Sequence, residues 1–220
     1  MSTFSIIITA GGLGKRMESS LPKQFIAIKD RPILMYSIEQ FYHFDPNFQL
    51  ILTLPEDWKL HWEELMLEHD FKIPHRVVTG GKERYHSVKN ALEYCTGDFI
   101  ATHDGVRPLV GYNTLKKGVE AIKKNDAVVP VVAIGESMRQ KVEGRTKAVN
   151  RTQYMLVQTP QWFKKEVIEK AYLQEYHEGI TDDAGLIEEA GYIITTVEGN
   201  LENIKITHKS DLQYAELFLK

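Results

Sequence analysis

The sequence predicts an α/β fold in which a mostly parallel, twisted β-sheet is flanked by helices on both faces. Three observations lead to this prediction. Short, β-branched apolar segments alternate with longer segments of helical periodicity, the first apolar segment runs into a glycine-rich loop, and 220 residues are enough to bury a substantial core. We expect one domain that spans residues 1–220.

The strand-like segments are short and rich in valine, isoleucine and threonine, which favour β-structure. In chain order they cover residues 5–10, 49–54, 75–79, 99–103, 127–133 and 192–197. Between them apolar residues recur at helical spacing, which predicts helices at residues 33–44, 58–69, 85–95, 112–124 and 164–176. This alternation indicates parallel strands joined by helical connections.

Ser210 is predicted to be the N-cap of a final helix, because Gln213 stands three residues later and completes a capping box. The helix carries apolar residues that can dock onto the sheet. They are Leu212, Ala215, Leu217, Phe218 and Leu219.

Residues 134–157 break the alternation, since they are rich in charge and weakly periodic. Within them, Glu143-Gly144-Arg145 is typical of a turn between two short alternating segments. The pattern predicts a protruding β-hairpin arm. Because a polar arm buries little surface within its own subunit, we expect it to mediate a homodimer.

Composition excludes several classes of protein. Cys95 is the only cysteine, so the chain forms neither an internal disulfide nor a cysteine-rich zinc site. A formal charge of −3 argues against nucleic-acid binding, and no apolar segment is long enough to span a membrane. The first residues lack a basic leader, so we expect no signal peptide and a cytoplasmic location.

Residues 10–23 form a glycine-rich loop followed by basic side chains. Thr9 stands where a Walker A loop needs its first glycine, and Met17 stands where a dinucleotide fingerprint needs its third, so neither motif fits. What remains is a turn whose amides can face a polyphosphate and whose cations can neutralise it. The alternative is a solvated surface loop. The residues concerned are Ala10, Gly11, Gly12, Gly14, Lys15, Arg16 and Lys23.

Asp104 stands at the carboxyl end of a predicted strand, the edge at which parallel sheets bind ligands. A single carboxylate there can hold Mg²⁺ while phosphates and water complete its coordination. The alternative is an ion pair with Arg107 that fixes a loop. His103 is expected to pack at the end of the strand, because no second histidine lies at metal-binding spacing.

Three further segments carry candidate polar residues. Gly81, with Ser87 one turn into the next helix, could contact a nucleoside, or the segment could be an ordinary tight turn. Lys205 lies in a β-branched run that suggests a strand, on which a solvent-facing lysine is the alternative. The acidic pair Asp182-Asp183 is most simply the start of a helix, and a pair of catalytic carboxylates is the less favoured interpretation.

In combination, these motifs resemble the 2-C-methyl-D-erythritol 4-phosphate cytidylyltransferase family of non-mevalonate isoprenoid biosynthesis. The resemblance spans nearly the whole chain. Its motifs are residues 10–17, Pro22-Lys23-Gln24, Gly80-Gly81, Arg84, Ser87-Val88, His103-Asp104, Arg107-Pro108, Arg151, Thr159-Pro160-Gln161, Thr181-Asp182-Asp183-Ala184 and residues 203–207. It implies a Rossmann-like nucleotidyltransferase fold, a homodimer formed through the arm, and a reaction that releases pyrophosphate from CTP.

The resemblance also implies roles for individual residues. Arg16 and Lys23 would bind the CTP phosphates and stabilise charge at the α-phosphorus, and Lys205 would add positive charge there. The nucleotide would be bound by Ala10, Gly11, Gly12, Gly14, Lys15, Gly81, Ser87 and Asp104, with Mg²⁺ held by Asp104. Methylerythritol phosphate would be held by Arg107, Arg151 and Thr159, with Arg151 reaching the site of the other subunit.

Two other functions stay open. With valine at position 106, the chain also resembles ribitol 5-phosphate cytidylyltransferases, which share the glycine loop and the Asn203-Ile204-Lys205 motif. A non-catalytic nucleotide-binding module is the alternative from another class, although this chain retains the basic and acidic residues that such a module would be expected to lose. For a transferase, the acceptor phosphate is already mostly dianionic at pH 7, so no general base is required.

Overall fold

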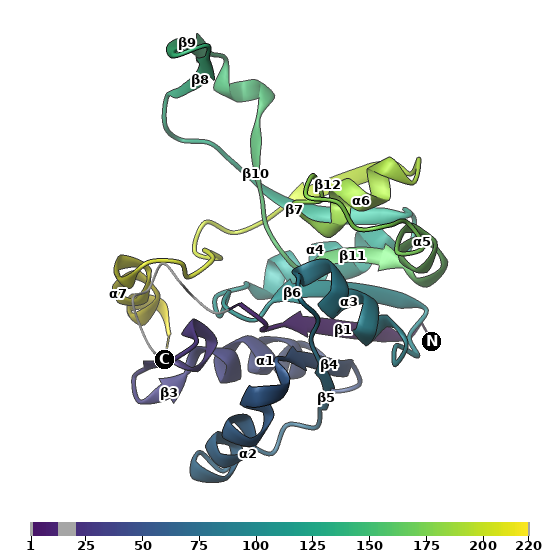
Figure 1. Ribbon diagram of the computed structural model, residues 1–220, viewed down its shortest axis with the longest axis vertical. Coiled ribbons are helices and arrows are strands. Elements are labelled where there is room, and N and C mark those ends of the chain that lie inside the picture. The colour runs from purple at the N-terminus through teal and green to yellow at the C-terminus, as the bar shows by residue number, and fades with distance from the viewer. Residues whose placement is uncertain (1, 13–20, 220) are drawn as a thin grey trace.

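The computed structural model describes residues 2–12 and 21–219, and it shows one central sheet with helices on both sides (Figure 1). Within the described residues the sheet has eight strands in the order β10-β7-β11-β6-β1-β4-β5, with β12 also paired to β7. The strands are β1 (Phe4–Thr9), β4 (Gln49–Leu54), β5 (Arg76–Thr79), β6 (Phe99–Asp104), β7 (Ala127–Ala133), β10 (Met155–Val157), β11 (Gln161–Lys164) and β12 (Ile194–Glu198). The predicted α/β class is therefore confirmed.

The parallel part of the sheet places the ends of distant segments together. β1 pairs in parallel with both β6 and β4, and Thr9 lies opposite Asp104 on one side and Thr53 on the other. Because parallel strands end at the same edge, the glycine loop that begins at Ala10 emerges beside Asp104. This register brings two of the predicted binding segments side by side.

Two apolar clusters cover the two faces of the sheet. On one face Ile6 and Ile8 pack with α1, α2 and α4, and on the other Ile7 packs with α3, α5 and α6, as the alternation of side chains along a strand requires. The helices are α1 (Ile33–Phe44), α2 (Lys59–Glu68), α3 (Arg84–Leu92), α4 (Tyr112–Ile122), α5 (Lys165–Ala171), α6 (Asp183–Glu189) and α7 (Lys209–Phe218). Within the described ranges, none of these helices has the length and apolar character needed to cross a membrane.

The sequence did not predict β11, and the helix expected from residue 164 begins at Lys165 and ends at Ala171. β11 runs antiparallel between β6 and β7. Its Trp162 and Phe163 are fully buried on opposite faces of the sheet. A four-residue strand with two large apolar side chains shows too little periodicity to be separated from the helix that follows it.

Two expectations near the carboxyl terminus were wrong. Residues 203–207 do not form a strand. The last helix begins at Lys209, and its N-cap is His208 rather than Ser210, because the Asp211 carboxylate accepts the His208 backbone N–H. Ala215 and Leu219 are buried as predicted, whereas Leu217 and Phe218 are exposed.

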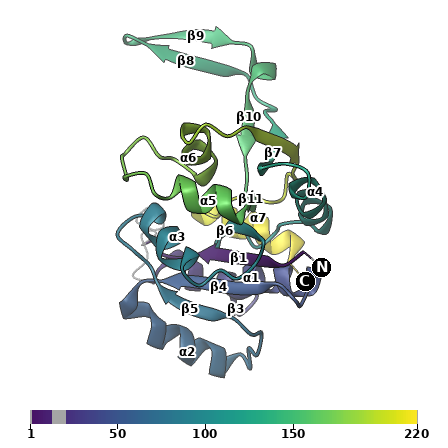
Figure 2. The ribbon, with the colours of Figure 1, turned by 90° about the vertical axis from the view of Figure 1, so that its right-hand side faces the viewer.

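The predicted β-hairpin arm is present and projects away from the sheet (Figures 1 and 2). β8 (Met138–Val142) and β9 (Arg145–Val149) pair antiparallel. Glu143 and Gly144 join them with positive φ angles of 43° and 76°, as a two-residue hairpin turn requires. After the arm the chain returns to the sheet as β10, which pairs with β7.

Gly118 is tightly packed against β11, and we expect Gly118→Ala to lower the free energy of unfolding by about 1–3 kcal/mol. A Cβ atom there would lie 2.1 Å from Trp162 Nε1, so the buried indole would have to move. Urea unfolding measures the change, and Lys116→Ala on the exposed side of the same helix serves as the control. Equal stability of the two variants would contradict the close approach.

Candidate active site

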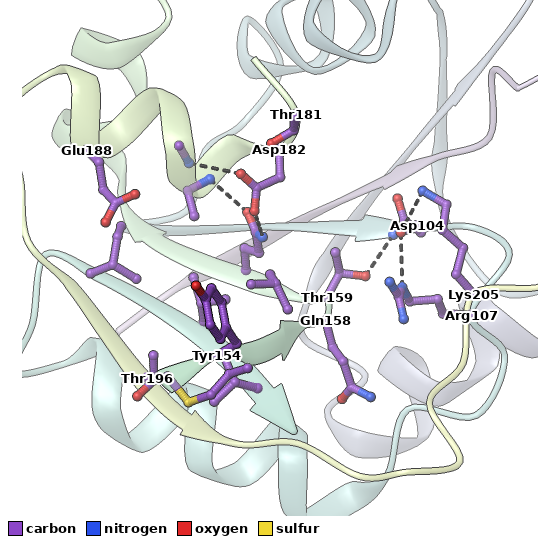
Figure 3. Close-up of a pocket in the computed structure, with 18 of the residues that line it drawn as sticks. Asp104, Arg107, Tyr154, Gln158, Thr159, Thr181, Asp182, Glu188, Thr196 and Lys205 are labelled. Carbon is purple, nitrogen blue, oxygen red and sulfur yellow. Dashed lines mark hydrogen bonds and ion pairs between the residues drawn. The ribbon is translucent and has the colours of Figure 1, made fainter. Parts of the chain in front are cut away.

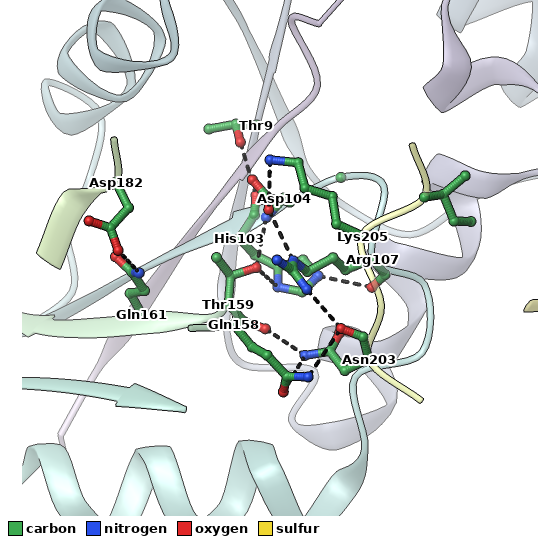
Figure 4. A network of polar contacts seen from close by, with 12 residues as sticks. Thr9, His103, Asp104, Arg107, Gln158, Thr159, Gln161, Asp182, Asn203 and Lys205 are labelled. Carbon is green, nitrogen blue, oxygen red and sulfur yellow. Dashed lines mark hydrogen bonds and ion pairs between the residues drawn. The ribbon is translucent and has the colours of Figure 1, made fainter. Parts of the chain in front are cut away.

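Asp104 occupies the centre of a polar cluster at the carboxyl end of β6 (Figure 4). Its side chain is only 8% exposed. Burial of a carboxylate is costly unless cations and hydrogen bonds compensate for the lost water. The neighbours of Asp104 therefore define what this position can do.

Among the described residues, three cations contact the Asp104 carboxylate. Arg107 Nε lies 3.0 Å and Lys205 Nζ 3.2 Å from Oδ2, and Arg84 Nε lies 3.5 Å from Oδ1. Burial by itself would raise the pKa of Asp104, but these cations outweigh it and hold that pKa well below its usual range. Asp104 is thus ionised at neutral pH.

A chain of hydrogen bonds ties Asp104 to the segment between β10 and β11 and to the loop after β6 (Figure 4). The Asp104 backbone N–H donates to Thr159 Oγ1 at 3.1 Å, and Thr159 Oγ1 lies 3.0 Å from His103 Nδ1. His103 Nε2 lies 3.1 Å from the Arg107 carbonyl oxygen. A carbonyl can only accept, so Nε2 carries the proton and Thr159 donates to Nδ1.

His103 is packed at the end of the strand, as the sequence predicted. It is fully buried, and burial lowers its pKa to about 4. The imidazole is therefore neutral at pH 7 and both of its nitrogens are engaged. It acts as a rigid link between Thr159 and the Arg107 backbone.

Two cavities are lined by Asp104. The first, which we call the glycine-loop cavity, has a volume of about 590 Å³, and the second, the arm-side cavity, has about 720 Å³ (Figure 3). Arg84, Asp104 and Lys205 line both. Two ligands bound in adjoining cavities would therefore face the same charged side chains.

The glycine-loop cavity collects most of the residues predicted to bind a nucleotide. Its lining includes Ala10, Gly11, Gly12, Lys23, Gly81, Ser87, Asp104 and Lys205. Lys23 is held in part by its Nζ, which donates to the Ile206 carbonyl at 3.2 Å. Gly14, Lys15 and Arg16 lie outside the described residues.

The segment around Gly81 is both a tight turn and part of the wall of the glycine-loop cavity. Gly81 N–H donates to Ser87 Oγ at 3.0 Å, and Ser87 Oγ donates to the Glu83 carbonyl. A Cβ on Gly81 would lie 2.2 Å from His86 Cβ, so only glycine fits here. The serine thus shapes the loop that borders the cavity.

The arm-side cavity lies between the sheet, the start of α6 and the base of the arm (Figure 3). Arg107 and Thr159, two of the predicted acceptor-binding residues, line it. The third, Arg151, is not part of this lining, although Gln153 of the same short 3₁₀ helix (Arg151–Gln153) is. Arg151 Nη1 instead donates to the Gly135 carbonyl on the arm. Within one subunit the three residues are not brought together.

Sequence reasoning gave no individual role to Arg84, although this residue lies at the meeting point of the two cavities. Its Nη2 also lies 2.7 Å from Asp183 Oδ2. Asp183 is the first residue of α6, with Asp182 as the N-cap, so the predicted helix start is confirmed. The available signal was an arginine three residues after the glycine pair, but its distance to Asp104 depends on the fold.

Comparisons with known proteins show similarity over nearly the whole chain. Residues 4–220 match the family described as 2-C-methyl-D-erythritol 4-phosphate cytidylyltransferase. The protein of that name from Bacteroides fragilis is 44% identical over 215 residues, which are 97% of this chain and 98% of the relative. Its counterpart from Bacteroides thetaiotaomicron is 42% identical over 216 residues, 98% of this chain and 99% of the relative.

Solved structures agree with the sequence comparisons. The crystal structure of 2-C-methyl-D-erythritol 4-phosphate cytidylyltransferase from Thermus thermophilus superposes with a TM-score of 0.80 at 26% identity and covers 99% of this chain and 98% of that one. The 4-diphosphocytidyl-2C-methyl-D-erythritol synthase from Anaerococcus prevotii gives a TM-score of 0.84 at 26% identity, with 99% and 96% coverage.

Thr159→Val should lower the free energy of unfolding by about 1–3 kcal/mol, because the buried Asp104 N–H and His103 Nδ1 would lose their partner. Thr159→Ser keeps the hydroxyl and is the matched control. Urea unfolding at pH 7.5 compares the two variants. If valine and serine are tolerated equally, the hydrogen-bond chain does not stabilise the site.

Proposed function

The chain belongs to the 2-C-methyl-D-erythritol 4-phosphate cytidylyltransferase family and is a nucleotidyltransferase of isoprenoid biosynthesis, and from this premise we propose how its residues act. The substrates are CTP and 2-C-methyl-D-erythritol 4-phosphate. The products are 4-diphosphocytidyl-2-C-methyl-D-erythritol and pyrophosphate. The junction of two cavities at the charged side chains Arg84, Asp104 and Lys205 carries this assignment.

CTP occupies the glycine-loop cavity. Ala10, Gly11 and Gly12 leave room for phosphate close to the backbone, and Lys23 supplies positive charge on the same wall. Gly81 and Ser87 form the part of the lining that meets the nucleoside. Gly14, Lys15 and Arg16 complete the phosphate-binding loop by their place in the sequence, and Arg16 acts with Lys23 on the charge that develops at the α-phosphorus.

Methylerythritol phosphate occupies the arm-side cavity. Arg107 and Thr159 lie at the end of this cavity next to Asp104 (Figure 3). Both are held in place by hydrogen bonds to the rest of the site, Arg107 through Nη1 to the Asn203 carbonyl at 2.8 Å and Thr159 through His103. A phosphate bound there would face the nucleotide across Lys205 and Arg84.

The reaction is an in-line displacement. An oxygen of the acceptor phosphate forms a bond to the α-phosphorus of CTP, the bond from that phosphorus to the bridging oxygen breaks, and pyrophosphate leaves with the electron pair. The acceptor phosphate, with a second pKa near 6, is mostly dianionic at pH 7 and needs no general base. His103 is buried with both ring nitrogens hydrogen-bonded to other groups of the protein, which agrees with a scheme that has no general base. Positioning and charge stabilisation supply the catalysis.

Mg²⁺ is the proposed cofactor, and Asp104 is the residue that would hold it. Among the described residues no three His, Cys, Asp or Glu side chains gather as a cluster that could hold a metal ion. A single ionised carboxylate at the junction of the cavities fits Mg²⁺, which combines one or two carboxylates with substrate phosphates and water. When bound, the ion would supply positive charge to the phosphate oxygens.

We also propose that the enzyme is a cytoplasmic homodimer joined through the arm. The exposed apolar residues at the base of the arm support this, with Tyr154, Met155, Leu156 and Val157 all between 46% and 54% exposed. Dimerisation would cover them and carry Arg151 toward the acceptor cavity of the other subunit. The formal charge of −3 gives no reason to add a nucleic-acid partner.

Val106, the residue shared with ribitol 5-phosphate cytidylyltransferases, lies on the nucleotide side of the site. It lines the glycine-loop cavity and packs with Ile33 and Ile206, and it is not part of the arm-side lining. It therefore contacts no part of the space assigned to the acceptor.

Pyrophosphate release with CTP and Mg²⁺ should depend on methylerythritol 4-phosphate as the acceptor. The assay compares this acceptor with ribitol 5-phosphate at equal concentration, with and without a chelator. We expect turnover with the first acceptor and its loss on removal of the metal. Turnover with ribitol 5-phosphate alone would reassign the substrate, and turnover with neither would favour a nucleotide-binding module.

Lys23→Ala should reduce kcat for pyrophosphate release by about 10²-fold or more, because it removes positive charge from the wall that faces the triphosphate. The fold should persist, as judged by melting temperature. Lys72→Ala is the control, since Lys72 is 80% exposed and pairs with Asp70 at the surface. Near-normal turnover of Lys23→Ala would remove this residue from the mechanism.

A further inference from the structure

Asp183 lies directly behind Arg84 and is almost completely inaccessible to solvent, with 1% of its side chain exposed. Its Oδ2 receives Arg84 Nη2 at 2.7 Å and the Thr102 hydroxyl at 2.6 Å. Its Oδ1 accepts a hydrogen bond from the Tyr172 hydroxyl. Among the residues that the structure describes, this carboxylate contacts two side chains of the interior, Thr102 and Tyr172, and one of the candidate active site, Arg84.

The backbone under Asp183 is fixed as firmly as its side chain. The preceding residue, Asp182, accepts the Gly185 N–H as the cap of α6 and also accepts Gln161 Nε2 at 2.8 Å. The Gln161 side-chain oxygen in turn accepts the Ala184 N–H at 2.9 Å. β11 and the start of α6 are therefore joined on both sides of Asp183, which leaves the carboxylate little freedom to follow Arg84 if Arg84 moves.

The Arg84 side chain, in contrast, is partly exposed, and its contact with Asp183 limits its movement. Its side chain is 27% exposed and lines both substrate cavities. The contact with Asp104 on the other side is long, 3.5 Å from Nε to Oδ1. The short contact with Asp183 is therefore the one that sets the position of the guanidinium.

The position matters because two anions must approach each other there. A triphosphate with about four negative charges and a dianionic acceptor phosphate repel each other, and this repulsion is stronger near a protein surface than in bulk water. A guanidinium fixed at the boundary of the two cavities offsets this repulsion where the new bond forms. A guanidinium that is free to turn into solvent would not offset the repulsion.

We propose that Asp183 is a positioning residue, which holds the Arg84 guanidinium at the boundary between the two substrate cavities so that the two phosphates can come together. The inference rests on the proposed function and adds to it a residue that contacts neither substrate. Asp183 acts only through Arg84. Its effect should therefore appear in turnover and should disappear when Arg84 is absent.

Asp183 could instead serve only to stabilise the packing of α6 against α5 and the sheet. Tyr172→Phe separates the two roles, because it removes the hydrogen bond to Oδ1 and leaves the ion pair at Oδ2. Asp183→Asn is the matched change, since the amide has the same shape and can still bond to Tyr172 and Thr102 but carries no negative charge to pair with the guanidinium.

The experiment measures kcat and KM for pyrophosphate release, together with melting temperature, for the wild type, Asp183→Asn, Tyr172→Phe, Arg84→Met and the double variant Arg84→Met/Asp183→Asn. We expect Asp183→Asn to lower kcat by about tenfold or more, because a charged group that is displaced even slightly stabilises the reacting phosphates less well. Tyr172→Phe should keep kcat within about threefold of the wild type. In the Arg84→Met background, Asp183→Asn should have no further effect on kcat.

The double variant removes both charges of the pair together, so it keeps the test valid if a single variant folds poorly. Wild-type turnover in Asp183→Asn, an equal loss in Tyr172→Phe, or a loss that adds in full to that of Arg84→Met would each overturn the inference. Those results leave the proposed function intact. Absence of turnover in the wild type overturns the proposed function and the inference with it.

Discussion

The buried carboxylate of Asp104 is the constraint on which the rest of the site depends. A charge that is 8% exposed persists only if cations compensate for the water it has lost, and here the cations come from three separate parts of the chain, the start of α3, the loop after β6 and residues 203–207. Removing the carboxylate would leave these cations close together without an anion between them. Asp104 thus organises the positive charge at the junction of the two cavities.

The placement of this positive charge explains how a protein with a net negative charge can accommodate anionic ligands. The formal charge of the chain is −3, yet Arg84, Lys205 and Lys23 line the glycine-loop cavity, and Arg107 joins Arg84 and Lys205 in the arm-side cavity. The parallel register between β1 and β6 makes this possible, because it sets the end of β1, where the glycine loop begins, beside Asp104. Two small phosphorylated ligands can then meet at one charged boundary.

Much of the architecture followed from local patterns. The alternation of strands and helices, the hairpin turn at Glu143 and Gly144, and the acidic start of α6 each depend on residues close together in sequence, and each is present. The patterns were insufficient where tertiary contacts prevail. β11 is stabilised by pairing with β6 and β7, and residues 203–207 are irregular while Lys205 contacts Asp104. At α7 one local motif replaces another, because His208 with Asp211 forms the cap in place of Ser210 with Gln213.

By itself the sequence determined the fold class, the family resemblance and the chemical character of the site, because glycines, lysines and an aspartate at strand ends carry their chemistry wherever the chain places them. Only the tertiary structure decided that Arg84 joins Asp104 to Asp183, that His103 is a neutral link to Thr159, and that Arg151 lies apart on the arm. These facts depend on distances between residues about 20 to 100 positions apart in the chain, which sheet register and helix packing set and which local patterns do not encode.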